Sequence, residues 1–169
     1  MTQPRIAVLD YGIGNLRSAQ KALEHVGARA ELTSDPSVTR AADAVVLPGV
    51  GAFGACMDAL RANGLEGVVH EAVGSGRPFL GICMGLQLLF DTGWEGGRQE
   101  GLGILAGEVV RFEPSPGLKI PHMGWNTVGW SKAAGSWAGR SDDWFYFVHS
   151  YVARPRDADV VAGLTDYGG

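Results

Sequence analysis

The chain has 169 residues, 46% of them hydrophobic and 19% charged, a composition typical of a folded globular domain that excludes a disordered chain. Its 14 basic and 18 acidic side chains give a net charge of −4 without any basic run, so neither nucleic acid nor an anionic membrane is expected as the main partner. No signal peptide and no membrane span are recognised, and two cysteines are too few for a disulfide framework, so a cytoplasmic location is expected.

The first half of the chain predicts alternating strands and helices. Short runs rich in apolar residues predict strands at residues 5–10, 30–32, 44–47 and 78–82. Apolar side chains at helical spacing predict helices at residues 15–26, 53–63, 65–73 and 83–90. The first of these helices is expected to be capped by Asn15 and to place Val26 on its apolar face. This alternation predicts an α/β fold, a doubly wound and mostly parallel sheet with helices on both faces.

The second half of the chain is rich in strand-forming residues and predicts little helix. Strands are expected at residues 107–112, 125–130, 144–151 and 160–165, as an antiparallel hairpin extension of the sheet. The 169 residues are expected to form one domain. Residues 165–169 have the composition of a hairpin turn with no strand after it, which predicts that a C-terminal strand and helix of this domain are lacking here.

The segment Gly-Ile-Cys-Met-Gly at residues 81–85 lies between a predicted strand and a predicted helix. Glycines on either side of a cysteine at such a junction are typical of a nucleophile elbow, a sharp turn at the carboxyl edge of the sheet. The helix dipole favours the thiolate form of Cys83, and the Met84 amide is placed to stabilise an oxyanion. An inert, buried thiol is the alternative. Cys56 lies on an apolar helix stripe without such glycines and is predicted to be a core residue.

A second glycine-rich loop, Pro-Gly-Val-Gly at residues 48–51, follows the strand predicted at residues 44–47. In a parallel sheet this loop lies at the carboxyl edge, where its backbone can supply a second oxyanion donor. A plain strand-to-helix turn is the alternative. Gly-Ile-Gly at residues 12–14 resembles the start of a dinucleotide fingerprint, but Arg17 stands where the third glycine is required, so no nucleotide cofactor is predicted.

A thiol that cleaves an amide needs a base, normally a histidine that is oriented by a carboxylate. His25 and His70 fall on predicted solvated helix faces, and neither His122 nor His149 has an acidic residue one or two positions away. Structural roles are therefore predicted for all four histidines. No pair of them has the spacing of metal ligands, so no metal site is expected.

These segments together resemble the class I (triad) glutamine amidotransferases. Residues 81–87 match the Gly-x-Cys-x-Gly-x-Gln signature of that family. Residues 10–15, 48–51, 121–126 and 146–151 narrow the resemblance to the glutaminase subunits of imidazole glycerol phosphate synthase, an enzyme of histidine biosynthesis. The resemblance extends along the whole chain.

The resemblance implies that Cys83 attacks the side-chain amide of glutamine, forms a glutamyl thioester and releases ammonia. It implies oxyanion donors at Val50 and Gly51, in addition to Met84. The positions implied to hold or line the glutamine site are Gln87, Glu95, Ser150 and Tyr151. The implied partner is a (β/α)8-barrel cyclase subunit that forms a heterodimer with this chain and receives the ammonia. The residues implied to lie toward that partner are Asn15, Tyr146 and His149.

One part of the family pattern is absent from the sequence. The family's general base and its orienting acid belong to a His-Pro-Glu motif, which occurs nowhere in the 169 residues. Without a proton for the leaving nitrogen, the tetrahedral adduct expels thiolate rather than ammonia, and the loss of a triad member costs roughly 10⁴ to 10⁶ in kcat in a comparable enzyme. These 169 residues are therefore expected to turn over glutamine slowly, with rescue by His122 or His149 as the alternative.

Two other interpretations of the residues stay open. The chain is consistent with the glutaminase of another class I amidotransferase, such as anthranilate synthase or pyridoxal phosphate synthase. It is also consistent with a non-catalytic sensor or binding domain that uses Cys83 as an oxidisable thiol. Protection of Cys83 by glutamine against a glutamine-like electrophile would favour an amidotransferase.

Overall fold

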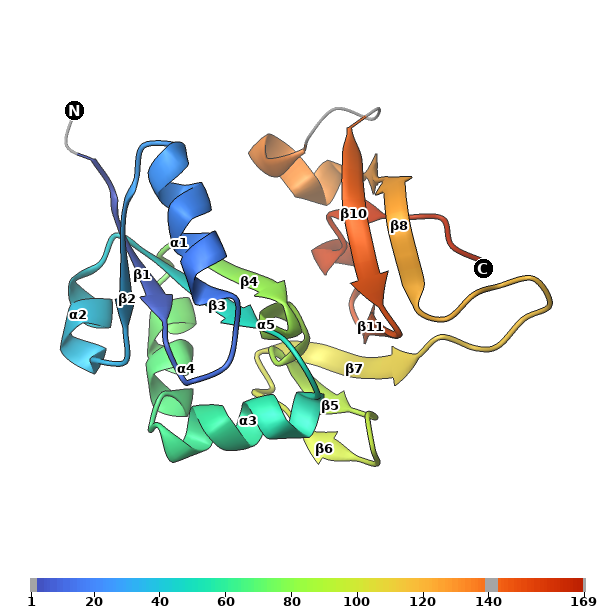
Figure 1. The fold of residues 1–169 in the computed structure, drawn as a ribbon, viewed down its shortest axis with the longest axis horizontal. Helices are drawn as coiled ribbons and strands as arrows, with labels where there is room; N and C mark the ends of the chain where they lie inside the picture. Colours follow the sequence, from blue (N-terminus) through green and yellow to red (C-terminus); the bar gives the residue numbers. More distant parts are fainter. Residues whose placement is uncertain (1–2, 139–142, 169) are drawn as a thin grey trace. The chain divides into compact units, whose positions relative to one another are not determined.

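A computed structural model of the chain describes residues 3–138 and 143–168. It consists of two compact units, Met1–Leu105 and Ala106–Gly169 (Figure 1). The first unit contains the alternating strands and helices, whereas the strand pairs that lie within the second are antiparallel. None of the helices in the described ranges has the length and hydrophobicity needed to cross a bilayer.

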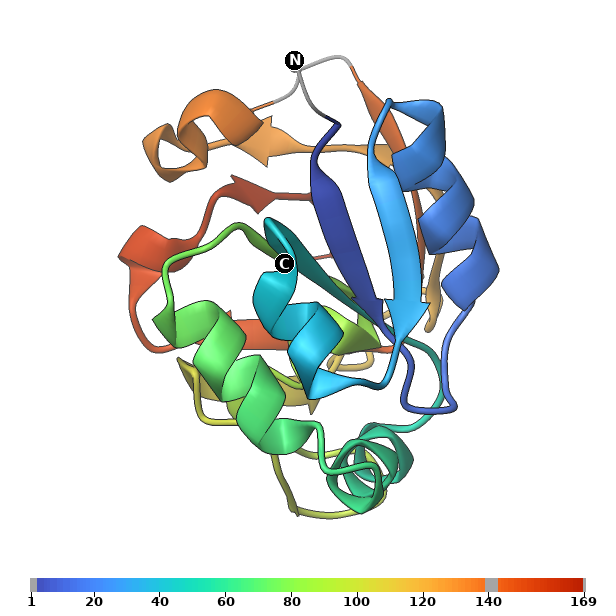
Figure 2. The same ribbon diagram turned by 90° about the vertical axis from the view of Figure 1, so that its left-hand side faces the viewer.

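The first unit is built on a four-stranded parallel sheet in the order β2-β1-β3-β4. Its strands are β1 (Arg5–Leu9), β2 (Arg29–Thr33), β3 (Ala44–Gly49) and β4 (Phe79–Cys83), followed by the antiparallel pair β5 (Phe90–Gly93) and β6 (Gln99–Glu100). Its helices are α1 (Leu16–His25), α2 (Pro36–Ala41), α3 (Phe53–Ala62), α4 (Glu66–Gly74) and α5 (Met84–Gln87). Figures 1 and 2 show α1 on one face of the parallel sheet and α2 and α4 on the other. The predicted α/β fold is confirmed.

The central strands β1 and β3 are buried on both faces. Successive side chains of a strand point to opposite sides of the sheet. Val8 and Val46 pack against Ala19 and Leu23 of α1 on one side. The residues that alternate with them are buried as well: Ala7, Leu9, Val45 and Leu47. The stripe predicted for α3 is confirmed, since all of its members are buried: Phe53, Cys56, Met57 and Leu60.

Several predictions about the ends of elements are wrong. Helix α1 ends at His25, and Val26 is exposed just beyond it. Asn15 precedes α1 but makes no side-chain capping hydrogen bond within the described residues. The helix predicted at residues 83–90 ends at Gln87, and Phe90 already belongs to β5. The apolar run at residues 88–90 fits a buried strand as well as a helix, so periodicity alone cannot separate the two. Helix α2 was not predicted.

The second unit consists of short strands joined by turns. The strands are β7 (Leu105–Arg111), which begins at the unit boundary, β8 (His122–Thr127), β9 (Gly129–Trp130), β10 (Trp144–His149), β11 (Tyr151–Pro155) and β12 (Gly163–Leu164). Two 3-10 turns, Lys132–Trp137 and Ala158–Val160, complete it. Strands β7 and β11, β8 and β10, and β9 and β12 pair antiparallel, as predicted. The run predicted at residues 144–151 breaks at Ser150 into β10 and β11.

The β8–β10 ribbon has two different faces. Residues directly opposite each other on paired strands share a face, and the register pairs Trp125 with Tyr146 and Met123 with Val148. The large side chains on this face are all exposed: Met123, Trp125, Trp144, Tyr146 and Val148. This set is the aromatic face of the ribbon.

The opposite face of the ribbon carries His122, which is only 3% exposed. Its ring stacks on Phe147 at a centroid distance of 4.7 Å and on Tyr167 at 3.7 Å. The ring of His149 lies 5.4 Å away, edge to face. Burial, together with the nearby His149, lowers the pKa of His122 below its ordinary value.

The β8–β10 ribbon is expected to lose stability as the pH falls below about 6.5, the ordinary pKa of histidine. Because the pKa of His122 is lowered in the folded chain, the unfolded chain takes up the proton first as the pH falls. The free energy of unfolding is therefore highest above the ordinary pKa of histidine. It decreases as the pH falls from there through the lowered pKa of His122 in the folded chain. Amide hydrogen exchange of β8 and β10, followed from about pH 8 to pH 5 and corrected for intrinsic rates, measures this loss. In His122→Phe the pH dependence should disappear; if it persists, another group causes it.

Candidate active site

Cys83 is the last residue of β4 and directly precedes α5. Its backbone has φ 55° and ψ −115°, and it is the one non-glycine residue with positive φ in the described parts of the chain. Such a conformation costs about 1–3 kcal/mol and persists only where surrounding structure enforces it. The side chain is exposed. The thiol is therefore not buried, as the alternative required, and the backbone is that of a nucleophile elbow.

The two glycines of the elbow are needed because backbone packs directly on backbone. A Cβ on Gly81 would lie 2.7 Å from the backbone nitrogen and Cα of Leu86. A Cβ on Gly85 would lie 1.8 Å from the carbonyl oxygen of Leu47. Any side chain at either position would push α5 away from the strands and move the sulfur of Cys83.

The loop of residues 48–51 lies beside the elbow, as predicted. The register of β3 and β4 pairs Gly49 with Cys83. A Cβ on Gly49 would lie 2.9 Å from the Gly85 nitrogen, so this loop packs against the start of α5. Val50 and Gly51 follow and are exposed, with Gly51 at φ +93°. The exposed backbone of this loop therefore adjoins the nucleophile.

Glu95 is hydrogen-bonded to the start of α3, two residues after this loop. Its Oε2 accepts a hydrogen bond of 2.9 Å from the backbone N–H of Phe53, the first residue of α3. Gln87 ends α5, and both Gln87 and Glu95 are partly buried. The first unit thus contains six of the predicted site residues on three neighbouring segments: Cys83, Met84, Val50, Gly51, Gln87 and Glu95.

The remaining predicted residues lie elsewhere. Asn15 is exposed just before α1, and Tyr146 belongs to the aromatic face of the second unit. Ser150 and Tyr151 are partly buried where β10 passes into β11. His149 faces away from Tyr146, and its Nδ1 lies 2.8 Å from the carbonyl oxygen of Tyr151. Since a carbonyl only accepts, Nδ1 carries the proton of this bond.

Two buried side chains beneath the loop were not predicted to have a role at the site. The Tyr11 hydroxyl donates a hydrogen bond of 2.7 Å to the Pro48 carbonyl, and the Cys56 thiol donates one of 3.2 Å to the Val50 carbonyl. Burial raises the pKa of the Tyr11 hydroxyl above its usual range, and burial likewise raises the pKa of the Cys56 thiol. The prediction that Cys56 lies in the core is confirmed. A role of Cys56 at the loop could have been predicted from its position in the first turn of α3, which follows the loop in the sequence.

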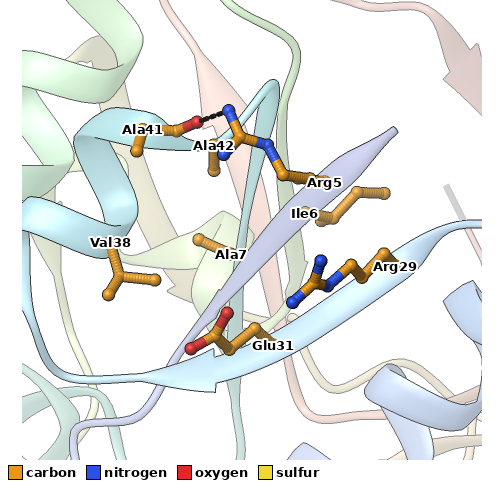
Figure 3. A pocket seen from close by; sticks show the side chains of 8 residues that line it. All are labelled: Arg5, Ile6, Ala7, Arg29, Glu31, Val38, Ala41 and Ala42. Carbon is orange, nitrogen blue, oxygen red and sulfur yellow. Dashed lines mark hydrogen bonds between the residues drawn. The ribbon is translucent and has the colours of Figure 1, made fainter. Parts of the chain in front are cut away.

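A separate pocket lies at the opposite edge of the parallel sheet. Figure 3 shows it between α2 and the first residues of β1 and β2, with Arg5, Arg29 and Glu31 among its walls. The Arg5 guanidinium is already used, because it donates a hydrogen bond to the carbonyl of Ala41. Ligands of such sheets bind at the carboxyl edge, so this pocket is not part of the active site. Within residues 3–138 and 143–168, no three His, Cys, Asp or Glu side chains are grouped to hold a metal ion.

A strained, exposed cysteine at the carboxyl edge of a doubly wound sheet, beside a glycine-rich loop, is the arrangement of a nucleophile elbow, the turn that carries the nucleophile in many α/β enzymes. The sequence model of the family described as "Glutamine amidotransferase class-I" matches residues 7–167. The chain belongs to this family.

Individual proteins and solved structures are also similar to this chain. The chain is 52% identical to "Imidazole glycerol phosphate synthase subunit HisH" of Rhodopirellula baltica, over 97% of this chain and 80% of that protein. It is also 52% identical to the protein of the same name from Syntrophotalea carbinolica, over 96% and 82% of the two chains. Among solved structures, PurLQS from Thermotoga maritima has a TM-score of 0.69 at 20% identity, over 99% of this chain and 78% of that one. A "Crystal structure of glutamine amidotransferase" has a TM-score of 0.68 at 21% identity, over 88% and 73%. These two structures support the fold alone.

Proposed function

We propose that this chain is the glutaminase subunit of an imidazole glycerol phosphate synthase and hydrolyses glutamine to glutamate and ammonia for histidine biosynthesis. The observation that carries the proposal is the strained, exposed Cys83 at the carboxyl edge of the sheet. The proposal is supported by relatives of that name that are 52% identical over nearly the whole chain.

The proposed reaction begins when the sulfur of Cys83 adds to the side-chain carbonyl carbon of glutamine. A sulfur–carbon bond forms, and the electron pair of the carbonyl π bond moves to the oxygen. The backbone N–H groups of Met84 and of the loop at Val50 and Gly51 are the proposed donors to this oxyanion. The oxyanion then re-forms the carbonyl and the carbon–nitrogen bond breaks. The nitrogen leaves as ammonia with the proton that the thiol gave up, which produces a glutamyl thioester. Water then attacks the thioester, and glutamate and the free thiol are released.

The remaining site residues are proposed to hold the substrate. One oxygen of Glu95 is used by Phe53, and its other oxygen suits the α-ammonium group of glutamine. Gln87 is proposed to contact the substrate from the end of α5. The substrate-binding role that the family resemblance implies for Ser150 and Tyr151 stays a prediction.

The leaving nitrogen needs a proton donor, and neither the elbow at residues 81–85 nor the loop at residues 48–51 contains a histidine. His25 and His70 are exposed on α1 and α4, and His122 and His149 take part in the ring stack of the second unit. The polypeptide of these 169 residues is therefore proposed to add glutamine at Cys83 but to turn it over slowly. A turnover within about tenfold of that of related glutaminase subunits would contradict this.

The partner is proposed to be the cyclase subunit of the same synthase, a (β/α)8 barrel that receives the ammonia in a heterodimer. The aromatic face of the β8–β10 ribbon is proposed to bind it, because Trp125 is 66% and Tyr146 is 55% exposed. Clustered exposed aromatic side chains are typical of binding surfaces. Asn15 of the first unit is also proposed to contact the partner.

The test of the glutaminase proposal is covalent labelling. The diazoketone analogue of glutamine, 6-diazo-5-oxo-norleucine, is expected to modify Cys83 at about one equivalent per chain and to be slowed by glutamine. Buried Cys56 serves as the internal control and should stay unmodified. Labelling by iodoacetamide alone, without protection by glutamine, would favour an oxidisable sensor thiol. Co-purification with the cyclase subunit, rather than with another synthase, tests the partner.

A further inference from the structure

The loop that adjoins the nucleophile is fixed at two of its carbonyl groups. Tyr11 bonds to the Pro48 carbonyl at 2.7 Å and Cys56 bonds to the Val50 carbonyl at 3.2 Å. Both side chains are buried, at 1% and 0% exposure. They come from different elements, since Tyr11 follows β1 and Cys56 belongs to α3.

These two bonds also fix the direction of backbone N–H groups. In a planar trans peptide, the C=O and the following N–H point in opposite directions. Because the Val50 carbonyl points to Cys56, the Gly51 N–H points away from the core. The Pro48 carbonyl points to Tyr11, so the Gly49 N–H is fixed in the same way. The peptide between them, which carries the Val50 N–H, is then held at both ends.

The Tyr11 hydroxyl is close to the elbow as well. A Cβ on Gly49 would lie 2.8 Å from the Tyr11 oxygen and 2.9 Å from both the Gly85 nitrogen and the Met84 Cβ. Gly49 is therefore packed between Tyr11 and the start of α5. A shift of the tyrosine oxygen would be transmitted to the loop and to the Met84 segment together.

The protonation of the two side chains follows from their partners. Carbonyl oxygens only accept, so the single proton of the hydroxyl and the single proton of the thiol are both used in these bonds. Both groups must then be neutral, and burial raises the pKa of each. Neither group is left with a proton for the reaction itself.

We infer that Tyr11 and Cys56 are positioning residues that fix the conformation of the loop at residues 48–51, whose Val50 and Gly51 N–H groups are the proposed donors to the oxyanion formed on Cys83. The inference rests on the proposed glutaminase function. It predicts that loss of either bond weakens the binding of a tetrahedral adduct much more than it weakens the binding of an amino acid in its ground state.

The test uses glutamate γ-semialdehyde, the aldehyde analogue of glutamine, on the full chain. The sulfur of Cys83 adds to the aldehyde carbon, a sulfur–carbon bond forms, the carbonyl π bond breaks, and the thiol proton moves to the oxygen. No group leaves, so the adduct places its tetrahedral-carbon oxygen at the proposed N–H donors but needs no proton for a leaving nitrogen. Its Kd is measured from the protection of Cys83 against iodoacetamide, read by mass spectrometry. Glutamate, measured in the same way, reports ground-state binding.

Tyr11→Phe and Cys56→Ala are each expected to weaken aldehyde binding by about tenfold or more, with glutamate binding changed by less than about twofold, because losing an oxyanion donor outright costs about 10²–10³ in kcat. Cys56→Ser keeps a donor and should recover most of the loss. The matched control is Thr39→Val, which removes a buried hydroxyl-to-carbonyl bond of 3.1 Å in α2 and should change neither constant.

Two results would overturn the inference. If the unsubstituted chain binds the aldehyde and both variants bind it equally tightly, the two side chains do not orient the donors. If aldehyde and glutamate binding fall together and Cys56→Ser restores neither, the side chains only maintain the fold. If the unsubstituted chain does not bind the aldehyde, the glutaminase proposal itself fails, and the inference fails with it.

Discussion

Replacement of Cys83 by alanine is expected to abolish diazoketone labelling, and to lower the already slow glutamine hydrolysis of these 169 residues only slightly, because the losses of triad members are not additive. No other described thiol can take over, because Cys56 is buried and its proton is used by the Val50 carbonyl. Labelling stoichiometry and a glutamate-release assay with the cyclase partner measure the effect.

A second substitution of Cys83 distinguishes the loss of the sulfur from the release of backbone strain. Glycine adopts the φ 55°, ψ −115° conformation of Cys83 at little cost, whereas a residue with a Cβ pays about 1–3 kcal/mol. Cys83→Gly is therefore expected to be as inactive as Cys83→Ala but more stable than it by about 1–2 kcal/mol in thermal unfolding. Equal stability of the two variants would mean that the backbone at Cys83 is not strained. Retained labelling in either would show that Cys83 is not the nucleophile.

Gly85→Ala is expected to destabilise the first unit by more than about 4 kcal/mol, or to prevent its folding. The added methyl group would lie 1.8 Å from the Leu47 carbonyl oxygen, and the contact is with backbone of a central strand rather than with a flexible side chain. Relief of this clash requires α5 to move away from β3, which also displaces Cys83. Denaturant unfolding of the soluble fraction measures the loss.

The matched control for this substitution is Gly67→Ala. Gly67 lies in α4, and a Cβ there would meet no atom within 4 Å. Alanine is expected to stabilise this helix by about 0.5–1 kcal/mol. If both variants lost stability to a similar extent, the close approach of α5 and β3 would not be what requires glycine at position 85.

The sequence alone predicted the parallel core and the position of the nucleophile because both depend on local spacing. Apart from α2, the strands and helices up to α4 were predicted to within a few residues, since their apolar periodicity and glycine boundaries are strong. The elbow was predicted from five consecutive residues. The predictions failed where local patterns are ambiguous, as at residues 88–90 and at Val26.

The sequence by itself determined the βα alternation, the glycine-flanked cysteine and the loop at residues 48–51, because each of these features depends on residues that lie close together in the sequence. Only the tertiary structure decided that Cys83 is strained and exposed, that Gly85 must lack a side chain, and that Tyr11 and Cys56 hold the loop. The bond from Tyr11 to Pro48 joins residues 37 positions apart, and no periodicity relates such positions. Which buried polar group meets which carbonyl is decided by how helices pack on the sheet.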